Sequence, residues 1–337
     1  MQTAVLVAVW TAAGLAVGAS AAPDGVDRAD NRTPVAEAVR SIEQRSRFFQ
    51  TGIFRARGRI VEDLGLDGKS VEEHETPVSI YAAFDWPGQR FRFDTKRSYW
   101  LPDRTYEAEF QFVSTQDRVI KRGRPKNTLI VYPAGEPPDR RTGMFNIRSL
   151  GLANCAELMA ATEPQRFFNS DGILSTKNVI ELEQVEPTLV KITWQFGPDN
   201  EARRTIWFDT GKGWVPIRLE ERYLVIEGDP PRAVPGKWSE PEHVCQVTWA
   251  RGSGGAWVPR TAVLTHRAGM FLADVPHHDL RRWELEFEWE SVNKPIDDTV
   301  FSIEGMDGPD RTSIVVDKTL GGRPTITQFP GKKAEEV

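Results

Sequence analysis

The sequence lacks several features that would mark a common enzyme. Its 337 residues include only two cysteines and five histidines, and neither a G-x-S-x-G nor an H-E-x-x-H motif occurs. The segment LGLDGKS resembles the end of a phosphate-binding loop, but Asp63 stands where that loop needs its first glycine. We therefore expect no enzyme, no catalytic residue and no bound cofactor.

A stripe of positive charge is also missing. The chain carries 43 Lys and Arg against 48 Asp and Glu, which gives a formal net charge of −5, and the two signs are mixed along its length. Proteins that bind nucleic acid concentrate positive charge on the surface that meets the phosphates. Nucleic acid is therefore not an expected partner.

Long apolar runs are absent after the N-terminus. The run from Ala4 to Val17 is followed by Ala19, Ser20 and Ala21, an A-x-A pattern typical of signal-peptide cleavage. We predict a signal peptide over residues 1–21, a flexible lead over residues 22–33, and export to the periplasm of a bacterial envelope. The alternative is that the segment stays uncleaved and anchors the chain in a membrane.

The two cysteines, Cys155 and Cys245, leave two interpretations open. In an exported protein they can form a disulfide, and closing a loop of about 90 residues would stabilise the fold by roughly 4 to 5 kcal/mol from chain entropy. They can also be two unrelated buried thiols. The sequence gives no distance between them and does not decide.

Aromatic residues are what the chain has in quantity, with 11 Trp and 17 Phe. Such residues favour strands. The segment RRWELEFEWES is the clearest case, because Trp283, Leu285, Phe287 and Trp289 alternate with glutamates. A strand with this period has one buried face and one solvated face.

Strand-turn-strand segments recur along the chain, so we predict a mainly β fold with few helices (α+β). The expected architecture is a curved antiparallel sheet, or half-barrel, covered by short helices. Helices are expected over Pro34–Phe49 and Arg148–Thr162. The domain is expected to span residues 34–305 with a Pro-rich insertion near 133–142, followed by a C-terminal strand and a disordered tail over 306–337.

Two segments echo each other, TIWFDTGKGWVPIRLE at 205–220 and VTWARGSGGAWVPRTAVL at 247–264. Each reads as Trp, a Gly-containing turn, Trp-Val-Pro and a further apolar run. We interpret them as equivalent hairpins of one repeated unit, in which glycine permits positive φ and proline lies near the start of the outgoing strand. The repetition is expected to be structural.

If these strands share one sheet, their aromatic side chains gather on one face. That face is either a filled core or an apolar trough that accepts an acyl chain or another apolar ligand. The candidate trough residues are Phe84, Trp86, Phe91, Phe93, Phe110, Phe112, Trp283, Leu285, Phe287 and Trp289.

Metal-ligand residue types crowd together only in DVPHHD, which contains Asp274, His277, His278 and Asp279. Adjacent histidines in a strand point to opposite faces, so joint ligation would need a loop. A solvated connection ahead of the Trp283 strand is the simpler interpretation. We therefore expect no metal site.

A resemblance to one family rests on the segments WFDTGKGWVPIRLE (207–220) and WESVNKPIDDTVFSI (289–303), together with the N-terminal helix and the long meander. The chain resembles the outer-membrane lipoprotein-sorting family, the LolA/LolB-like carriers. In that family a curved half-barrel holds lipid or a lipoprotein acyl chain on its concave side beneath short helices. The resemblance implies the same architecture here, and the absence of a lipid-attachment cysteine fits the soluble carrier side of the family.

Three functional hypotheses follow. The first is a soluble periplasmic carrier or sensor that binds a lipid or lipoprotein acyl chain in the trough, with a membrane-associated protein as a possible partner. The second is a protein-interaction module on the same fold with a filled core. The third is a metal-dependent enzyme around His277 and His278.

Overall fold

The computed structural model describes residues 35–41, 44, 49–64, 72–101, 104–122, 128–136, 145–154, 157–158, 165–168, 172–228, 232–268, 279–307, 313–319 and 323–328. The predicted signal peptide, the flexible lead and most of the Pro-rich insertion lie outside these residues. Within the described part of the chain, no helix is both long and apolar enough to cross a membrane.

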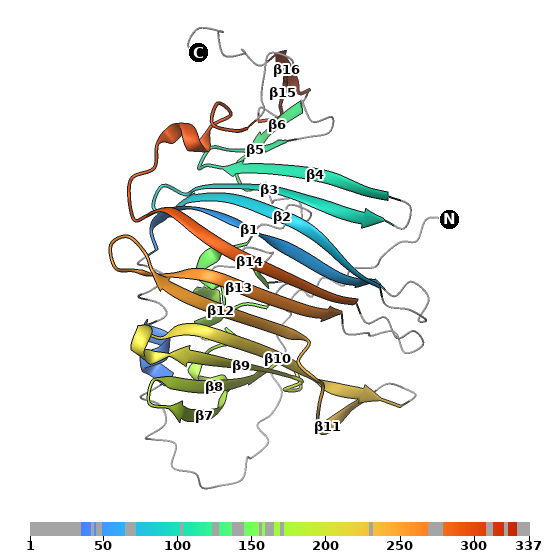
Figure 1. Cartoon of the computed structure of the whole chain (residues 1–337), viewed down its shortest axis with the longest axis vertical. Helices are drawn as coiled ribbons and strands as arrows, with labels where there is room; N and C mark the ends of the chain where they lie inside the picture. Colours follow the sequence, from blue (N-terminus) through green and yellow to red (C-terminus); the bar gives the residue numbers. More distant parts are fainter. Residues whose placement is uncertain are drawn as a thin grey trace.

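Sixteen strands form one sheet (Figure 1). The strands of the first half are β1 (Thr51–Leu64), β2 (Glu72–Asp85), β3 (Arg90–Leu101), β4 (Arg104–Ser114), β5 (Arg118–Arg122) and β6 (Thr128–Pro133). The strands of the second half are β7 (Val179–Glu186), β8 (Leu189–Phe196), β9 (Ala202–Asp209), β10 (Val215–Glu227), β11 (Arg232–Trp238), β12 (His243–Arg251), β13 (Trp257–Ala268), β14 (Asp279–Val292), β15 (Ile314–Asp317) and β16 (Thr325–Gln328).

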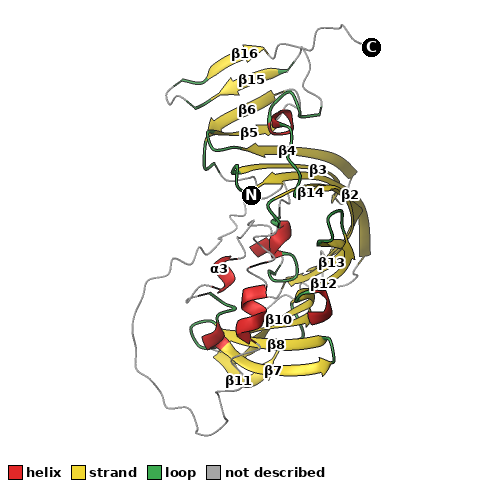
Figure 2. Ribbon diagram, turned by 90° about the vertical axis from the view of Figure 1, so that its left-hand side faces the viewer, coloured by secondary structure: helices red, strands yellow, loops and turns green. Residues whose placement is uncertain are grey.

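The sheet follows the order β16-β15-β6-β5-β4-β3-β2-β1-β14-β13-β12-β10-β9-β8-β7, with β11 paired to β10 beside this path. It is open, curved and antiparallel, apart from the parallel pair β15 and β6. Figure 2 shows short helices and loops on its concave side. The predicted fold class is therefore confirmed, although the C-terminal region contributes two strands where one was expected.

The helices are short, and several of them lie against the concave face, which we call the inner face. Residues 35–41 and 44 are helical, in agreement with the first predicted helix. The second predicted helix, Arg148–Thr162, is wrong as one continuous helix, because Gly151 adopts a φ of +80°, in the left-handed region where an α-helix cannot continue. Residues 157–158 within that range are helical. The described segments there are η2 (Ile147–Ser149), helical residues 157–158, α3 (Gln165–Phe168) and η3 (Thr176–Asn178).

The two faces of the sheet carry separate cores. The inner core combines the apolar positions of most strands with the buried side chains of the short helices, including Val35, Leu152 and Phe167. A smaller core lies on the opposite, outer face of β2 to β6, where Ala83 and Val113 pack near Phe301. Phe301 belongs to η5 (Asp298–Phe301), which follows β14 along the chain.

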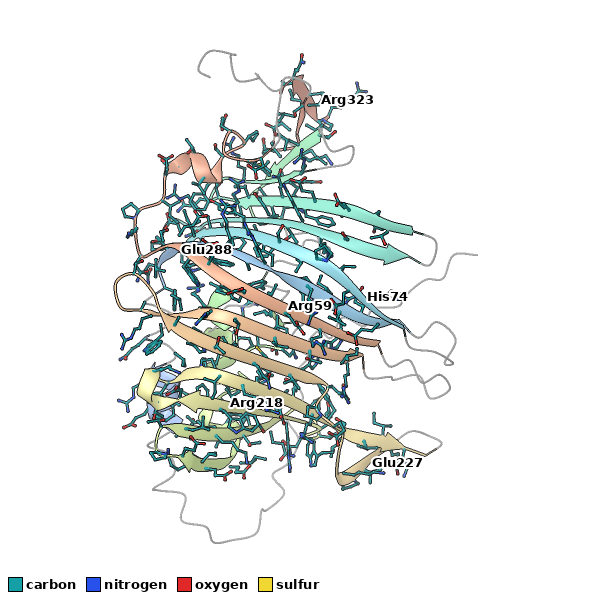
Figure 3. All side chains as sticks on the ribbon, viewed as in Figure 1. Arg59, His74, Arg218, Glu227, Glu288 and Arg323 are labelled. Atoms are coloured by element: carbon teal, nitrogen blue, oxygen red, sulfur yellow. The ribbon has the colours of Figure 1, made fainter. Side chains whose placement is uncertain are left out.

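On the outer face of β1 and β14, basic side chains of β1 lie opposite acidic side chains of β14. Register places Arg55, Arg57 and Arg59 opposite the glutamates of β14. Arg55 Nε lies 2.6 Å from a Glu290 carboxylate oxygen, and Arg59 Nε lies 2.7 Å from a Glu284 oxygen. Figure 3 shows Arg59 and Glu288 on these neighbouring strands. The wet face predicted for RRWELEFEWES is confirmed.

The two echoed hairpins, β9–β10 and β12–β13, are only partly equivalent. Trp249 and Trp257 are one residue further apart than Trp207 and Trp214. Because side chains alternate between the two faces of a sheet along each strand, this extra residue places the first tryptophans of the two hairpins on opposite faces. Trp249 is buried in the inner core, whereas Trp207 points outward, where the Arg218 guanidinium lies 5.4 Å from its ring. The first hairpin also contains a short turn, η4 (Thr210–Lys212).

What the hairpins share is a register shift at the proline. In each case a tryptophan on the neighbouring strand of the sheet donates a hydrogen bond from its indole N–H to the carbonyl oxygen of the proline. Trp249 Nε1 donates to Pro216 O over 2.8 Å, and Trp289 Nε1 donates to Pro259 O over 2.9 Å. The repeated Trp-Val-Pro therefore has the structural role that we predicted.

Gly58 lies at a close approach of β1 to the backbone of β14. A Cβ added there would overlap the backbone oxygen of Glu284, so Gly58→Ala must displace a central strand pair. We expect a loss of about 1–3 kcal/mol or more in the free energy of unfolding. Gly211→Ala, at an exposed turn, is the control. Equal urea-unfolding energies for the two variants would contradict this close approach.

Candidate functional site

The predicted trough residues lie on the inner face, and all except Phe110 belong to the inner core. The buried members are Phe84, Phe93, Phe112, Trp283, Leu285 and Phe287, and the partly buried ones are Trp86, Phe91 and Trp289. Phe110 is on the same face of β4, with the Arg97 guanidinium 5.8 Å from its ring. The pattern thus predicted where these side chains gather.

Phe145 fills the centre of this aromatic face. Its side chain is 1% exposed, and its ring centroid lies 5.6 Å from Phe93, 6.3 Å from Phe54 and 6.4 Å from Phe287. The sequence did not single out Phe145, because it follows the Pro-rich region with no periodic pattern of its own. The middle of the predicted trough is therefore packed by the chain itself.

One end of the aromatic face remains open to a hollow of about 540 Å³. Trp86 and Phe91 form its aromatic wall, with ring centroids 5.8 Å apart, and Phe91 continues inward to Phe93 at 6.1 Å. The other lining residues come from three turns, the strand ends beside them, and η2: Gln89, Arg90, Ser114, Thr115, Gln116, Ala134, Gly135 and Arg148. We call this space the end hollow.

Arg148 is held against the aromatic wall. Its guanidinium carbon lies 3.9 Å from the centroid of the Trp86 ring, a cation–π arrangement. Asn146 caps η2 by accepting from Arg148 N over 3.1 Å, which places Arg148 in the first turn. The second arginine of the hollow, Arg90, is bound by Asp85 at 2.5 Å and also by Asp298.

A buried ion pair anchors the segment that carries Phe145 and Arg148. Arg204 on β9 is fully buried, and its Nε donates to a Glu221 oxygen on β10 over 2.7 Å. Arg204 Nη1 also donates to Leu152 O over 3.1 Å. Asn154 Nδ2 donates to the second Glu221 oxygen over 3.0 Å. The pair therefore ties residues 152–154 to the sheet.

A reciprocal cap continues the same anchor. Glu157 N donates to Asn154 Oδ1 over 2.9 Å, and Asn154 N donates to Glu157 Oε2 over 3.0 Å, as in a capping box. The same Glu157 carboxylate lies 2.9 Å from Arg204 Nη2. Thus one buried guanidinium meets two carboxylates, which compensates the cost of removing its charge from water.

The alternation of β9 contains a signal for this buried pair. Arg204 is in phase with the buried Ala202, Ile206 and Phe208 of β9, so alternation places a charge on the dry face. Glu221 is its direct partner in the β9–β10 register. Although burial acts to raise it, the Arg204 charge and the Tyr223 hydroxyl hold the pKa of Glu221 below its ordinary value.

Two histidines that look scattered in the sequence meet beside this anchor. His243 on β12 and His266 on β13 are register partners, and their Nδ1 atoms lie 3.0 Å apart with the rings stacked at 4.5 Å. A hydrogen bond between two imidazole nitrogens needs one of them unprotonated. Burial lowers the pKa of His243 to about 4.

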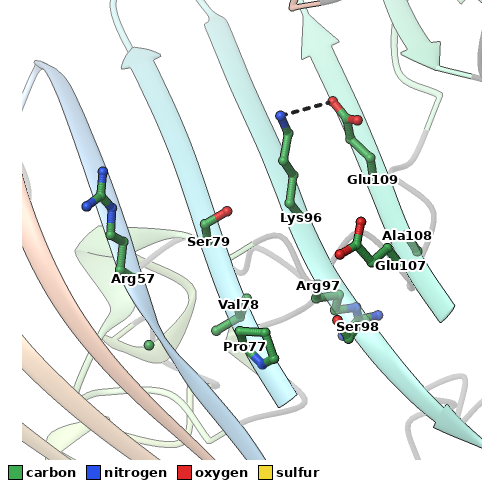
Figure 4. A pocket seen from close by; sticks show the side chains of 11 residues that line it. Arg57, Pro77, Val78, Ser79, Lys96, Arg97, Ser98, Glu107, Ala108 and Glu109 are labelled. Atoms are coloured by element: carbon green, nitrogen blue, oxygen red, sulfur yellow. Dashed lines mark ion pairs between the residues drawn. The ribbon is translucent and has the colours of Figure 1, made fainter. Parts of the chain in front are cut away.

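A second hollow, of about 410 Å³, lies at β1 to β4. Figure 4 shows Arg57, Ser79, Lys96 and Glu109 along its wall, with Lys96 Nζ 3.7 Å from Glu109 Oε1. No large aromatic ring lines it among the described residues, and both signs of charge are present. We call this space the outer hollow.

Several predictions fall on residues outside the described part of the chain. Cys155 is one of these, so both interpretations of the cysteines, a disulfide with the buried Cys245 or two unrelated thiols, stay open. His277 and His278 are others. Among the residues that are described, no group of three or more His, Cys, Asp or Glu side chains is arranged to hold a metal ion.

Comparison with known proteins identifies no family. No protein-family model and no curated protein matches the chain. Among solved structures, a DUF1329 family protein from Desulfovibrio piger is 9% identical, with a TM-score of 0.36, covering 81% of this chain and 99% of that chain.

Two further structures match at similar levels. An uncharacterized conserved protein from Thermus thermophilus is 8% identical with a TM-score of 0.28, covering 84% of this chain and 99% of that one. A porin-like protein from Bacteroides uniformis is 9% identical with a TM-score of 0.26, covering 71% and 98%. None of the three is described as a lipoprotein-sorting carrier.

The buried Arg204–Glu221 pair predicts that removing one charged partner costs more stability than replacing both partners with apolar residues. Glu221→Gln leaves the Arg204 charge undercompensated in the interior, and we expect a loss of about 3–5 kcal/mol in unfolding free energy. The double variant Arg204→Met, Glu221→Leu should recover much of this loss. Glu183→Gln, in an exposed pair with Lys191, should change stability by less than about 1 kcal/mol. Urea unfolding of wild type and the three variants gives the comparison. A double variant that is as unstable as Glu221→Gln, or less stable, would contradict the coupling.

The histidine pair predicts a pH dependence of stability. Because the pKa of His243 falls to about 4 on folding, the unfolded chain binds the extra proton first as pH decreases from about 6.5. We expect unfolding free energy to decrease between pH 6.5 and 4, by at most about 3 kcal/mol. His243→Phe should flatten this part of the profile, whereas the control His74→Gln should keep it. A wild-type profile that is flat in this window would contradict the assignment.

Proposed function

We propose that the protein is a carrier or sensor that receives an apolar chain in the end hollow. One observation carries this proposal: the hollow opens on two partly buried aromatic rings that continue into the aromatic core. Its volume of about 540 Å³ is in the range of small-molecule sites. Burial of apolar surface would supply the affinity, at about 25 cal/mol per Å².

The ligand class within this proposal is a lipid or lipoprotein acyl chain. The resemblance of 207–220 and 289–303 to the lipoprotein-sorting family favours it, as does the enrichment of aromatic residues on the inner face. A periplasmic location belongs to the same proposal, because it depends on the leader pattern of residues 1–21. A membrane-associated partner would deliver or receive the ligand.

A protein-interaction module is the second candidate, and Phe145 favours it. This ring occupies the middle of the inner face, where the resemblance implies a ligand chain. In that case the aromatic face is a core, and recognition uses loops or strand edges. The two proposals differ in whether the purified protein binds a lipid.

Filling the end hollow tests the first proposal. Ala134 lies at the rim and is exposed, so Ala134→Trp should occupy the hollow without disturbing the core. We expect a Kd for a fluorescent fatty acid at least about tenfold weaker, with an unchanged melting temperature. Ser79→Trp, in the outer hollow, should bind like wild type.

Three results would contradict the proposal. Wild-type protein that binds no fluorescent fatty acid, and carries no lipid in native mass spectrometry, would favour the interaction module. Equal binding by Ala134→Trp and wild type would place the ligand elsewhere. Weaker binding by Ser79→Trp alone would move the site to the outer hollow.

A further inference from the structure

The open sheet ends in two edge strands, β7 and β16, which lie at opposite ends of the molecule (Figure 1). Each pairs with one neighbour, and no further strand of the described chain lies beyond it. Alternate residues of an edge strand direct their backbone N–H and C=O groups away from the sheet, so an edge can pair with a strand of another chain. Proteins oppose such pairing with charges and bulges on the edge. The two edges of this sheet differ in both features.

The β7 edge carries the features that oppose strand addition. Its pairing with β8 has two register shifts, one after Val179 and one after Gln184, and such bulges twist an edge out of the flat geometry that pairing needs. Glu181, Glu183 and Glu186 lie within the same eight residues. A second copy of β7 placed alongside would bring like charges together, which is destabilising.

The β16 edge has neither feature within its four residues. Thr325–Gln328 pairs with β15 in an unbroken register and contains no charged side chain. Ile326 on this strand is 69% exposed, the largest exposed fraction among the large hydrophobic side chains of the described residues. A single exposed isoleucine is ordinary on a protein surface. Ile326 matters because of the row of side chains that it ends.

This row is apolar where it reaches the edge, and it lies on the inner face. Register pairs Ile326 with Val316 on β15, and Val316 with Ile130 on β6. Lys121, the β5 partner of Ile130, is also the partner of the inner-core residue Phe112 on β4. Because paired residues lie on the same face of a sheet, the whole row belongs to the inner face. A strand added to β16 would continue it.

We propose that β16 pairs with β16 of a second copy of this chain, antiparallel and about a two-fold axis at Ile326, so that one sheet runs through a dimer. Ile326 then lies opposite Ile326 of the second copy, and the apolar row continues from one protomer into the other. A two-fold axis makes the contact isologous, so the assembly closes at two copies. Pairing of β16 with β7 would not close in this way, and the bulges of β7 oppose it.

The length of β16 sets the strength of this contact. Pro324 precedes the strand and has no backbone N–H to donate to a ladder, so the pairing stays confined to a short segment. Interfaces of small area are typical of weak and reversible association. We therefore expect a dimer that forms as the protein concentration rises and dissociates on dilution.

Sedimentation velocity of the purified protein over a concentration series tests the pairing. Wild type should be a monomer at about 1 µM and a reversible dimer at about 200 µM, as for a contact of small area. Ile326→Lys, which places two like charges at the axis, should stay a monomer. Ile180→Lys is the matched control at the β7 edge, where Ile180 is 50% exposed, and should dimerise like wild type. Because both side chains are exposed, neither change should lower the melting temperature by more than about 2 °C.

A mixing experiment tests the two-fold axis itself. Ile326→Glu alone should also stay a monomer, because two carboxylates would then meet at the axis. An equimolar mixture of Ile326→Lys and Ile326→Glu should recover the dimer, because opposite charges then face each other. Recovery requires that position 326 of one copy lies opposite position 326 of the other, so a merely general effect of charge on this edge would not produce it.

The contrary results are equally specific. Wild type that is still a monomer at about 200 µM would overturn the proposed contact. Loss of the dimer in Ile180→Lys, with Ile326→Lys unaffected, would assign the contact to β7. A mixture of the two position-326 variants that stays monomeric would exclude the axis at Ile326. None of these measurements uses a ligand, so their outcome is independent of the proposed carrier function.

Discussion

The register of β1 against β14 decides which side chains of this sheet are dry. In the observed register, apolar side chains such as Trp283 and Phe287 face the inner core, while the glutamates between them meet arginines of β1 on the outer face. A slip of one residue would bury the charges and expose the rings at the same time. Each fully buried apolar side chain contributes about 1.5–3 kcal/mol. The exposed ion pairs between β1 and β14 contribute little to the free energy of unfolding, but a slip in register would also break them.

The apolar inner face of the curved sheet needs a cover, and residues 145–154 provide part of it. Residues 145–154 place Phe145 in the centre of the inner face, Arg148 on the wall of the end hollow, and Leu152 and Asn154 on the Arg204–Glu221 pair. Loop backbone above an apolar surface leaves polar groups that need partners. The buried ion pair supplies such partners, which explains why a charge lies among apolar neighbours on β9.

The parts of this fold that follow from local alternation could be predicted, and the parts set by distant contacts could not. The period of two in RRWELEFEWES places Trp283 and Phe287 correctly, because face selection depends only on neighbouring residues. Similar segments do not guarantee the same orientation, because one extra residue between the tryptophans of the second hairpin places Trp249 on the inner face, whereas Trp207 lies on the outer face. His243 and His266 meet only through strand pairing, and Phe145 reaches the inner face without any periodic pattern. The end hollow combines three turns and η2, so no single stretch of sequence contains it.

Phe145 and the buried ion pair act on the same segment of the chain. The Phe145 ring packs against Phe93 and Phe287 at one end of residues 145–154, and the Arg204–Glu221 pair binds residues 152–154 at the other end. Loss of the pair would release the backbone of residues 152–154, and with it the restraint on the ring that fills the centre of the inner face. The packing of the inner face and the buried charge pair are therefore physically coupled through residues 145–154.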